Sequence, residues 1–287
     1  MSKKGLKTPL RYPGGKSRAC TKMGQFFPDL REYTEYREPF LGGGSVAIHV
    51  SKMYPNLKIW VNDLYEPLIN FWMNLQMFGG ELYTELKNLK IINCNQDSAR
   101  CLFAEMKDII NDKTKTDLER AVAFYVVNKC SFSGLTESSS FSAQASDSNF
   151  SMRGIEKLPE YQEIISNWHI NGYSYEHLLE YNPHDGLFMY LDPPYDIKDN
   201  LYGKKGAMHK SFDHDKFAED CDQHNNIKML ISYNSDQLVK NRFKNWTAGE
   251  FDLTYTMRSV GDYMSDQQKR KELLLFNYKL SEVTVDG

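Results

Sequence analysis

The chain is organised around the stretch Gly186-Leu187-Phe188-Met189-Tyr190-Leu191-Asp192-Pro193-Pro194-Tyr195. An apolar run typical of a buried strand ends there at a carboxylate, two prolines and an aromatic ring. Both prolines hold φ near about −65° and Pro194 has no backbone N–H, so the strand cannot continue through them. We therefore expect a stiff loop at the carboxyl end of a strand, which is where open α/β sheets bind their ligands.

This loop has the chemistry to hold a planar amino group. The Asp192 carboxylate and the Pro193 carbonyl both accept hydrogen bonds, and a planar amine has two N–H donors. Tyr195 can stack on the ring that carries the amine. The loop contains no cysteine, which favours direct transfer to an exocyclic nitrogen over covalent attack on a base carbon. The alternative is an Asp-Pro-Pro turn without a function, since these residues are common in turns.

Composition indicates one large α/β domain with a smaller insertion, because the chain has 287 residues and 41% are hydrophobic. The formal net charge of −3 provides no overall basic field, so binding of a nucleic acid would need a local basic stripe. Five cysteines without a C-x-x-C pair are typical of reduced thiols in the cytoplasm. No apolar run reaches the roughly 18 residues of a membrane helix, so we expect a soluble intracellular protein.

Basic residues are densest between residues 2 and 18, around the stretch Arg11-Tyr12-Pro13-Gly14-Gly15-Lys16-Ser17. Its last three residues look like the end of a phosphate-binding P-loop, but Leu10 stands where that motif needs a glycine. A Gly-Gly turn beside a lysine could instead hold a carboxylate. The alternative is a solvated basic tail followed by a turn.

A second glycine-rich turn follows a predicted strand at residues 35–40. The turn is Leu41-Gly42-Gly43-Gly44-Ser45, and an apolar helical pattern begins directly after it. Glycines in this position let a ligand approach the backbone closely. The next predicted strand, residues 57–61, ends at Asn62-Asp63, where an acidic side chain suits hydrogen bonding to ribose hydroxyls. Together these features predict a site for a cofactor that contains a nucleoside.

Helical spacing of apolar residues dominates residues 64–128 and predicts an inserted helical subdomain. We expect its helices near residues 67–72, 82–89, 99–110 and 118–127. The serine-rich segment from Cys130 to Asn149 is interpreted as a long polar loop, either a mobile functional segment or simply disordered. Strand patterns return at residues 168–170, 187–191, 228–233 and 272–278. Strands that alternate with helices indicate a mostly parallel sheet.

Four motifs occur in one order along nearly the whole chain: Arg11-Tyr12-Pro13-Gly14-Gly15-Lys16, Glu38-Pro39-Phe40-Leu41-Gly42-Gly43-Gly44-Ser45, Asn62-Asp63 and Asp192-Pro193-Pro194-Tyr195. In this order they resemble the Dam-type (D12 class, α-group) adenine-N6 DNA methyltransferases. The resemblance implies S-adenosylmethionine as methyl donor and a Rossmann-like catalytic domain with an inserted, mainly helical target-recognition domain. We therefore expect a catalytic domain in two parts, residues 1–66 and 154–287, around an insertion at residues 67–153.

The resemblance also implies roles for single residues. The catalytic residues would be Asp192, Pro193, Pro194 and Tyr195. Tyr12 and Lys16 would lie at the methionine end of the cofactor, Asp63 would hold the ribose, and Tyr175 would flank the adenine, with Ser174 in place of an acid common in the family. The full set of cofactor-binding residues would be Tyr12, Gly14, Lys16, Glu38, Pro39, Phe40, Gly42, Gly44, Ser45, Asp63, Tyr175 and Asp192.

Residues 129–135 resemble the hairpin with which the family contacts DNA, with Phe132 at the aromatic position that wedges into the base stack. Glu137 stands where enzymes that read GATC carry an arginine. A glutamate can only accept hydrogen bonds and would be repelled by the acceptors of guanine. We expect Arg11 to read a guanine 5′ of the target adenine, with relaxed or altered preference on the 3′ side. The alternative is that Glu137 lies in a solvated loop and that Lys129 or Arg153 reads the guanine. The implied DNA-binding residues are Arg11, Arg18, Lys129, Phe132, Ser133, Leu135 and Glu137.

The expected reaction is methyl transfer to the N6 amine of an adenine flipped out of double-stranded DNA, without a metal. Cytosine N4, RNA or a protein glutamine are alternative acceptors for the same fold. The motif form usual for a protein glutamine has Asn in place of Asp192, which favours a base. A DNA-binding module with a decayed active site is a further alternative. A cognate restriction endonuclease is a candidate partner. We expect a monomer or weak dimer in the bacterial cytoplasm, encoded by the host or by a phage.

Overall fold

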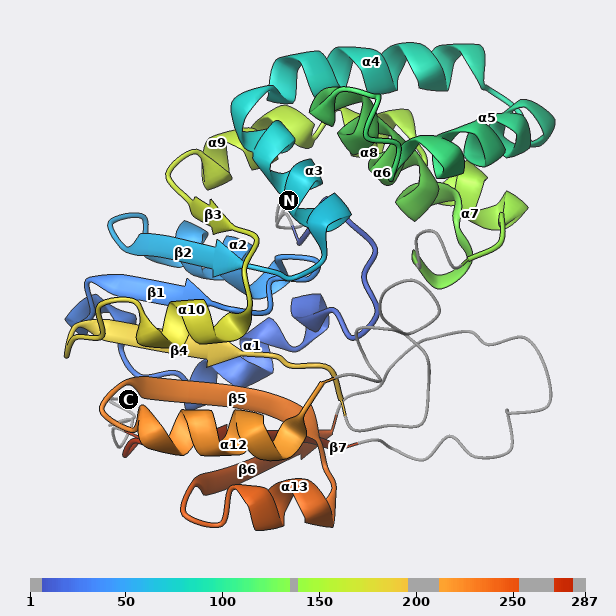
Figure 1. Ribbon diagram of the computed structural model, residues 1–287. Helices are drawn as coiled ribbons and strands as arrows, with labels where there is room; N and C mark the ends of the chain where they lie inside the picture. Colours follow the sequence, from blue (N-terminus) through green and yellow to red (C-terminus); the bar gives the residue numbers. More distant parts are fainter. Residues whose placement is uncertain (1–6, 135–138, 196–211, 253–270, 281–287) are drawn as a thin grey trace, which may run out of the picture.

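The computed structural model describes residues 7–134, 139–195, 212–252 and 271–280. Its centre is a sheet of seven strands in the order β3-β2-β1-β4-β5-β7-β6 (Figure 1). The first five strands in this order are parallel, and β7 runs antiparallel to both β5 and β6. The strands are β1 Glu35–Glu38, β2 Lys58–Asn62, β3 His169–Asn171, β4 Leu187–Leu191, β5 Lys228–Asn234, β6 Thr247–Asp252 and β7 Lys271–Phe276.

Helices cover both faces of the sheet, which explains why β4 is buried along its whole length. Side chains alternate between the two faces along a strand. Phe188 and Tyr190 belong to one apolar core, whereas Leu187, Met189 and Leu191 belong to the other. The helices of the sheet layers are α1 Cys20–Met23, α2 Ser45–Met53, α10 Tyr175–Glu180, α12 His214–Gln223 and α13 Gln237–Arg242, with short 3-10 helices η1 Lys16–Arg18, η2 Gly24–Phe26 and η3 Leu30–Glu32.

A mainly helical layer is inserted between β2 and β3 and lies beyond the β3 side of the sheet (Figure 1). The predicted helices between residues 64 and 128 are confirmed as α3 to α6. Helix α6 is central, with Ala121 to Cys130 all buried, and it begins at a capping box formed by Thr116 and Glu119. The inserted helices are α3 Glu66–Met77, α4 Gly79–Ile92, α5 Gln96–Ile109, α6 Asp117–Cys130, α7 Ala143–Ser148, α8 Met152–Ile155 and α9 Leu158–Ile165.

The prediction of one long polar loop over the serine-rich segment is wrong for part of that segment. Ser142 accepts a hydrogen bond from the Ala145 amide and caps α7, in which alanine favours the helix. Phe141 forms a bridge with Ser131 and packs against Phe103 at a ring distance of 5.6 Å. The Phe141 ring and the cap at Ser142 therefore give this stretch a defined structure. Its polar composition alone does not distinguish it from a loop.

Strand β6 was not predicted. The expectation of a mostly parallel sheet is confirmed, since β3, β2, β1, β4 and β5 are parallel and the two pairs that β7 makes are antiparallel. β6 has no apolar run, and a Cβ at its Gly249 would lie 2.4 Å from the Phe26 ring. This strand pairs with β7 over six residues, so it is stabilised by a partner distant in sequence. In the described residues no helix is both long and apolar enough to span a membrane.

Candidate active site

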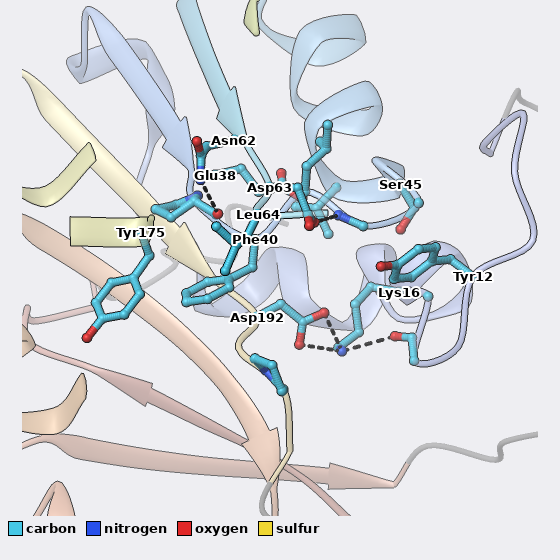
Figure 2. Close-up of a pocket in the computed structure, with 18 of the residues that line it drawn as sticks. Tyr12, Lys16, Glu38, Phe40, Ser45, Asn62, Asp63, Leu64, Tyr175 and Asp192 are labelled. Carbon is cyan, nitrogen blue, oxygen red and sulfur yellow. Dashed lines mark hydrogen bonds and ion pairs between the residues drawn. The ribbon is translucent and has the colours of Figure 1, made fainter. Parts of the chain in front are cut away.

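A pocket opens at the carboxyl ends of β1, β2 and β4, where three of the motifs follow a strand, and the segment with Tyr12 and Lys16 lines it as well (Figure 2). Parallel strands end at the same edge of a sheet, which brings residues distant in sequence together. The pocket is lined by Tyr12, Pro13, Gly14, Gly15, Lys16, Glu38, Pro39, Phe40, Leu41, Gly42, Gly43, Ser45, Val46, Asn62, Asp63, Leu64, Tyr173, Ser174, Tyr175, Asp192, Pro194 and Phe212.

The glycine turn after β1 forms one wall of the pocket. Gly42 and Gly44 have φ of 48° and 66°, a conformation that L residues with a side chain rarely adopt. A Cβ at Gly42 would lie 2.9 Å from the Tyr12 ring, and one at Gly44 would lie 2.8 Å from Trp72. Glycine is therefore required both by the backbone and by close packing against Tyr12 and α3.

Asp63 supports this turn from the end of β2. Its Oδ2 accepts from the Gly42 amide at 2.9 Å and its Oδ1 accepts from the Tyr65 amide at 3.0 Å. Burial raises the pKa of Asp63 from its ordinary value of 3.8 to about 6. The Leu64 amide also contributes a hydrogen bond, so three of about four lone-pair sites are occupied and about one remains for a further donor.

A cluster of packed aromatic rings forms a second wall. The Phe40 and Tyr175 rings stack at 5.5 Å with 28° between their planes, and Phe212 meets Phe40 edge-on at 5.7 Å. Tyr175 is held in place because its hydroxyl donates to Asp220 at 2.6 Å. The helix that carries Tyr175 is anchored by the buried Arg37, whose Nη1 donates to two carbonyls at its C-terminal end.

The catalytic motif lies where β4 ends. Lys16 Nζ donates to both oxygens of Asp192 at 2.7 Å and to the Gly14 carbonyl at 3.1 Å. Ser232, on β5, donates to Asp192 Oδ1 at 2.7 Å and is itself 2.8 Å from the Tyr190 hydroxyl. Asp192 is therefore held by residues from two distant segments, and its side chain remains 22% exposed toward the pocket.

Two further carboxylates lie close to this motif. Glu272, on β7, is 3.3 Å from Lys16 Nζ and accepts a hydrogen bond from the Tyr195 hydroxyl. Glu38 accepts from the Tyr36 hydroxyl at 2.8 Å, and burial raises its pKa well above the usual range, which favours the neutral acid. Burial alone would lower the pKa of Lys16, but the charges of Asp192 and Glu272 raise it well above its ordinary value. The lysine is therefore an ammonium ion.

The predicted DNA-contacting segment adjoins the pocket. Asn128 accepts from the Arg11 amide at 2.9 Å and donates to the Arg11 carbonyl at 2.6 Å. The Arg11 guanidinium donates to the Ser131 carbonyl at 2.7 Å, and burial lowers the pKa of Lys129 to about 7. Phe132, in the 3-10 helix η4 (Phe132–Gly134), is 47% exposed. These contacts join the last turn of α6 to the segment that carries Tyr12 and Lys16.

The remaining predicted DNA-binding residues are only partly placed. The backbone of Ser133 belongs to η4, and the backbone of Arg18 belongs to η1. Leu135 and Glu137 lie outside the described residues. The structure therefore leaves the interpretation of Glu137 as a prediction.

The sequence analysis missed several residues of the site, among them Phe212, Ser232 and Glu272. Ser232 could have been found, because it lies near the carboxyl end of a predicted strand and such ends line the site in a parallel sheet. Glu272 could also have been found, because it is an acidic residue at the start of a predicted apolar strand. Phe212 has no signal of its own, since an aromatic residue before a helix is most often part of a core.

The Rossmann-like sheet, its pocket at the carboxyl strand ends and the inserted helices define a methyltransferase fold. The family model of the D12 class N6 adenine-specific DNA methyltransferases matches residues 12–257, and the chain belongs to this family. The protein is therefore an enzyme that methylates adenine N6 in DNA, and the family implies S-adenosylmethionine as its methyl donor.

Curated relatives agree with this assignment. The Type II methyltransferase M.MjaIII of Methanocaldococcus jannaschii is 25% identical over 202 residues, covering 66% of this chain and 69% of the relative. The Type II methyltransferase M1.LlaDCHI of Lactococcus lactis subsp. cremoris is 23% identical over 289 residues, covering 96% and 97%. The DNA N-6-adenine-methyltransferase of Escherichia phage P1 is 29% identical over 126 residues, covering 44% of this chain and 15% of the relative.

Proposed function

We propose that the pocket in Figure 2 binds S-adenosylmethionine and that Asp192 and the Pro193 carbonyl orient the N6 amine of a flipped-out adenine toward it. The observation that carries this proposal is the position of Asp192, which lies at the end of β4 on the edge of a pocket bordered by the glycine turn and Asp63. This arrangement joins a pocket lined by the glycine turn and Asp63 to the acceptors that an amine needs.

The lining residues fit the cofactor chemically. The packed rings of Phe40, Tyr175 and Phe212 offer an aromatic surface against which a flat purine ring can lie. Asp63 has acceptor capacity left for a ribose hydroxyl, and the turn at Gly14 suits the amino-acid end. S-adenosylmethionine supplies a methyl group already activated by its sulfonium, so the chain needs no nucleophilic side chain.

The chain's own contribution to the reaction is positioning and electrostatics. The two N–H groups of the amine donate hydrogen bonds, one to Asp192 and one to the Pro193 carbonyl. These two bonds direct the lone pair of the amine toward the cofactor. The Tyr195 ring offers a face on which the extruded adenine stacks. Extrusion costs a few kcal/mol, which stacking and these hydrogen bonds offset.

We propose that residues 67–153 form the target-recognition part, with the catalytic domain in the two flanking parts, residues 1–66 and 154–287. Support comes from the exposed Phe132 ring and from the Arg11 guanidinium beside the pocket, whereas Lys129 is buried. Double-stranded DNA would be bound across this edge, with Arg11 reading a guanine 5′ of the adenine. Because Glu137 replaces an arginine of enzymes that read GATC, the proposal also predicts an altered preference for the base on the 3′ side of the adenine.

The experiment that tests the function is sequencing of DNA, with detection of modified bases, from cells that express the protein. Methylated adenine within a defined short sequence is expected, and that sequence identifies the recognition site. Assays on GATC duplexes and their single-base variants then test the readout. Strict dependence on GATC that survives Glu137→Ala would refute the altered readout. A restriction endonuclease partner and a monomeric or weakly dimeric state stay predictions.

Asp63→Ala should weaken binding of S-adenosylmethionine by about 1.5 to 3 kcal/mol, because a charge-assisted hydrogen bond to the ribose is lost. The pKa of Asp63 is about 6, and protonation removes the charge, so wild-type affinity should fall as the pH drops through about 6. The affinity of the variant should lack this dependence. Calorimetry at several pH values measures both effects. Equal affinities at neutral pH would mean that Asp63 only supports the turn at Gly42.

A further inference from the structure

We propose that Glu272, on the antiparallel strand β7, is a positioning residue for methyl transfer: it holds the Lys16 ammonium when Asp192 engages the target amine. This inference rests on the proposed role of Asp192. Glu272 is only 1% exposed, and it contacts two groups of the site at once, Lys16 and Tyr195. Residues 192 and 195 belong to the catalytic loop, whereas Glu272 comes from a strand on the far side of β5.

The acceptor sites of Asp192 are nearly filled in the free protein. A carboxylate has about four lone-pair sites. Lys16 donates to both oxygens of Asp192 at 2.7 Å, and Ser232 donates to Oδ1 at 2.7 Å. Only one site, on Oδ2, is left, so an incoming amine shares this oxygen with Lys16 and weakens its bond to the ammonium.

Glu272 is the carboxylate placed to receive the ammonium. Its Oε1 lies 3.3 Å from Lys16 Nζ, so a displacement of a few tenths of an ångström turns this contact into a close ion pair. Lys16 is 2% exposed, and a buried ammonium without a partner is strongly unfavourable. Two carboxylates around one lysine thus allow Asp192 to accept a substrate donor while the lysine stays paired.

The Glu272 carboxylate also holds the Tyr195 ring in position. The Tyr195 hydroxyl donates to Glu272, the Lys16 ammonium lies 5.0 Å from the Tyr195 ring centroid, and the ring stacks on Tyr233 at 6.0 Å. Glu272 therefore fixes the ring on which the flipped adenine is proposed to stack. A change at this one position should affect both the chemical step and the stacking of the base.

Glu272→Gln tests this role, because it removes the charge and keeps the size of the side chain. The matched control is Glu250→Gln, the same change on β6, where Glu250 pairs with Lys240 on the surface. The assay uses a duplex with the site found by sequencing and measures the single-turnover rate at saturating S-adenosylmethionine and DNA. A second duplex carries 2-aminopurine in place of the target adenine, and its fluorescence reports base flipping.

We expect Glu272→Gln to slow the single-turnover rate by about 10- to 100-fold, as for other small misplacements at an active site, and to reduce the 2-aminopurine signal. Affinity for S-adenosylmethionine should stay within about twofold, because Glu272 does not line the pocket. Glu250→Gln should match the wild type in all three measurements. A role limited to stability would lower the melting temperature and leave the rate and the fluorescence of the folded fraction unchanged, and this result would overturn the proposal.

Two comparisons keep the outcome unambiguous. If Glu272→Gln does not fold, Tyr195→Phe removes the hydroxyl contact with Glu272 and retains every charge. It should reduce the 2-aminopurine signal, and a wild-type signal would refute the positioning of the ring by Glu272. The wild-type protein is measured in parallel. If the wild type transfers no methyl group, the proposed role of the pocket is wrong. If the wild type and the Glu272→Gln variant are equally active, only the proposed role of Glu272 is wrong.

Discussion

Asp192→Ala should reduce methyl transfer by about 10³-fold or more, because it removes the acceptor that orients the target amine, and preorganised electrostatic groups contribute on this scale. The structure places this carboxylate at the end of β4, held by Lys16 and Ser232. Binding of DNA should be largely retained, since the proposed DNA contacts are made by other residues. Single-turnover transfer of a labelled methyl group measures the effect, and a gel-shift assay measures DNA binding.

The matched control for this change is Asp185→Ala, an exposed aspartate at the other end of β4, which should keep wild-type activity. Asp192→Asn is informative as well, because it retains one acceptor oxygen but weakens the bond to Lys16. Turnover by Asp192→Ala at the wild-type rate would show that the amine is oriented by another group, and the assignment of the motif would be wrong.

Lys16→Met should lower the free energy of unfolding by about 3 to 5 kcal/mol at neutral pH, because it leaves Asp192 and Glu272 facing each other without their shared cation. The sign follows from the pKa of Lys16, which lies well above its ordinary value of 10.5. The contribution of the ammonium to stability is therefore complete below pH 10.5 and is lost only as the pH rises through the higher pKa of the folded state. Urea denaturation of wild type and variant measures the difference.

Lowering the pH should partly restore the stability of Lys16→Met, because protonation of one carboxylate relieves the repulsion between Asp192 and Glu272. Lys52→Met, at an exposed position of α2, is the control and should change stability by less than about 0.5 kcal/mol. A Lys16→Met protein as stable as the control at neutral pH would contradict the view that this lysine neutralises Asp192 and Glu272.

Those parts of the site that depend on local geometry follow from the amino-acid sequence alone. The prolines after Asp192 stop β4 whatever surrounds them. The glycines at 42 and 44 predict a turn that a side chain would obstruct, and both have positive φ. Periodicity located the helices α3 to α6, since each has to bury an apolar stripe. The order of these motifs also predicted the family, which the comparison with the family model confirmed.

Which charged groups lie together in the site became clear from the folded structure. Lys16, Asp192 and Glu272 come from three segments, and no spacing between them indicates that they share one hydrogen-bond network. The antiparallel β6–β7 pair and the cap of α7 likewise depend on partners found during folding. The physical reason is that backbone conformation is set by neighbours in the chain, whereas side-chain partners are set by packing across the sheet, where residues far apart in sequence become adjacent.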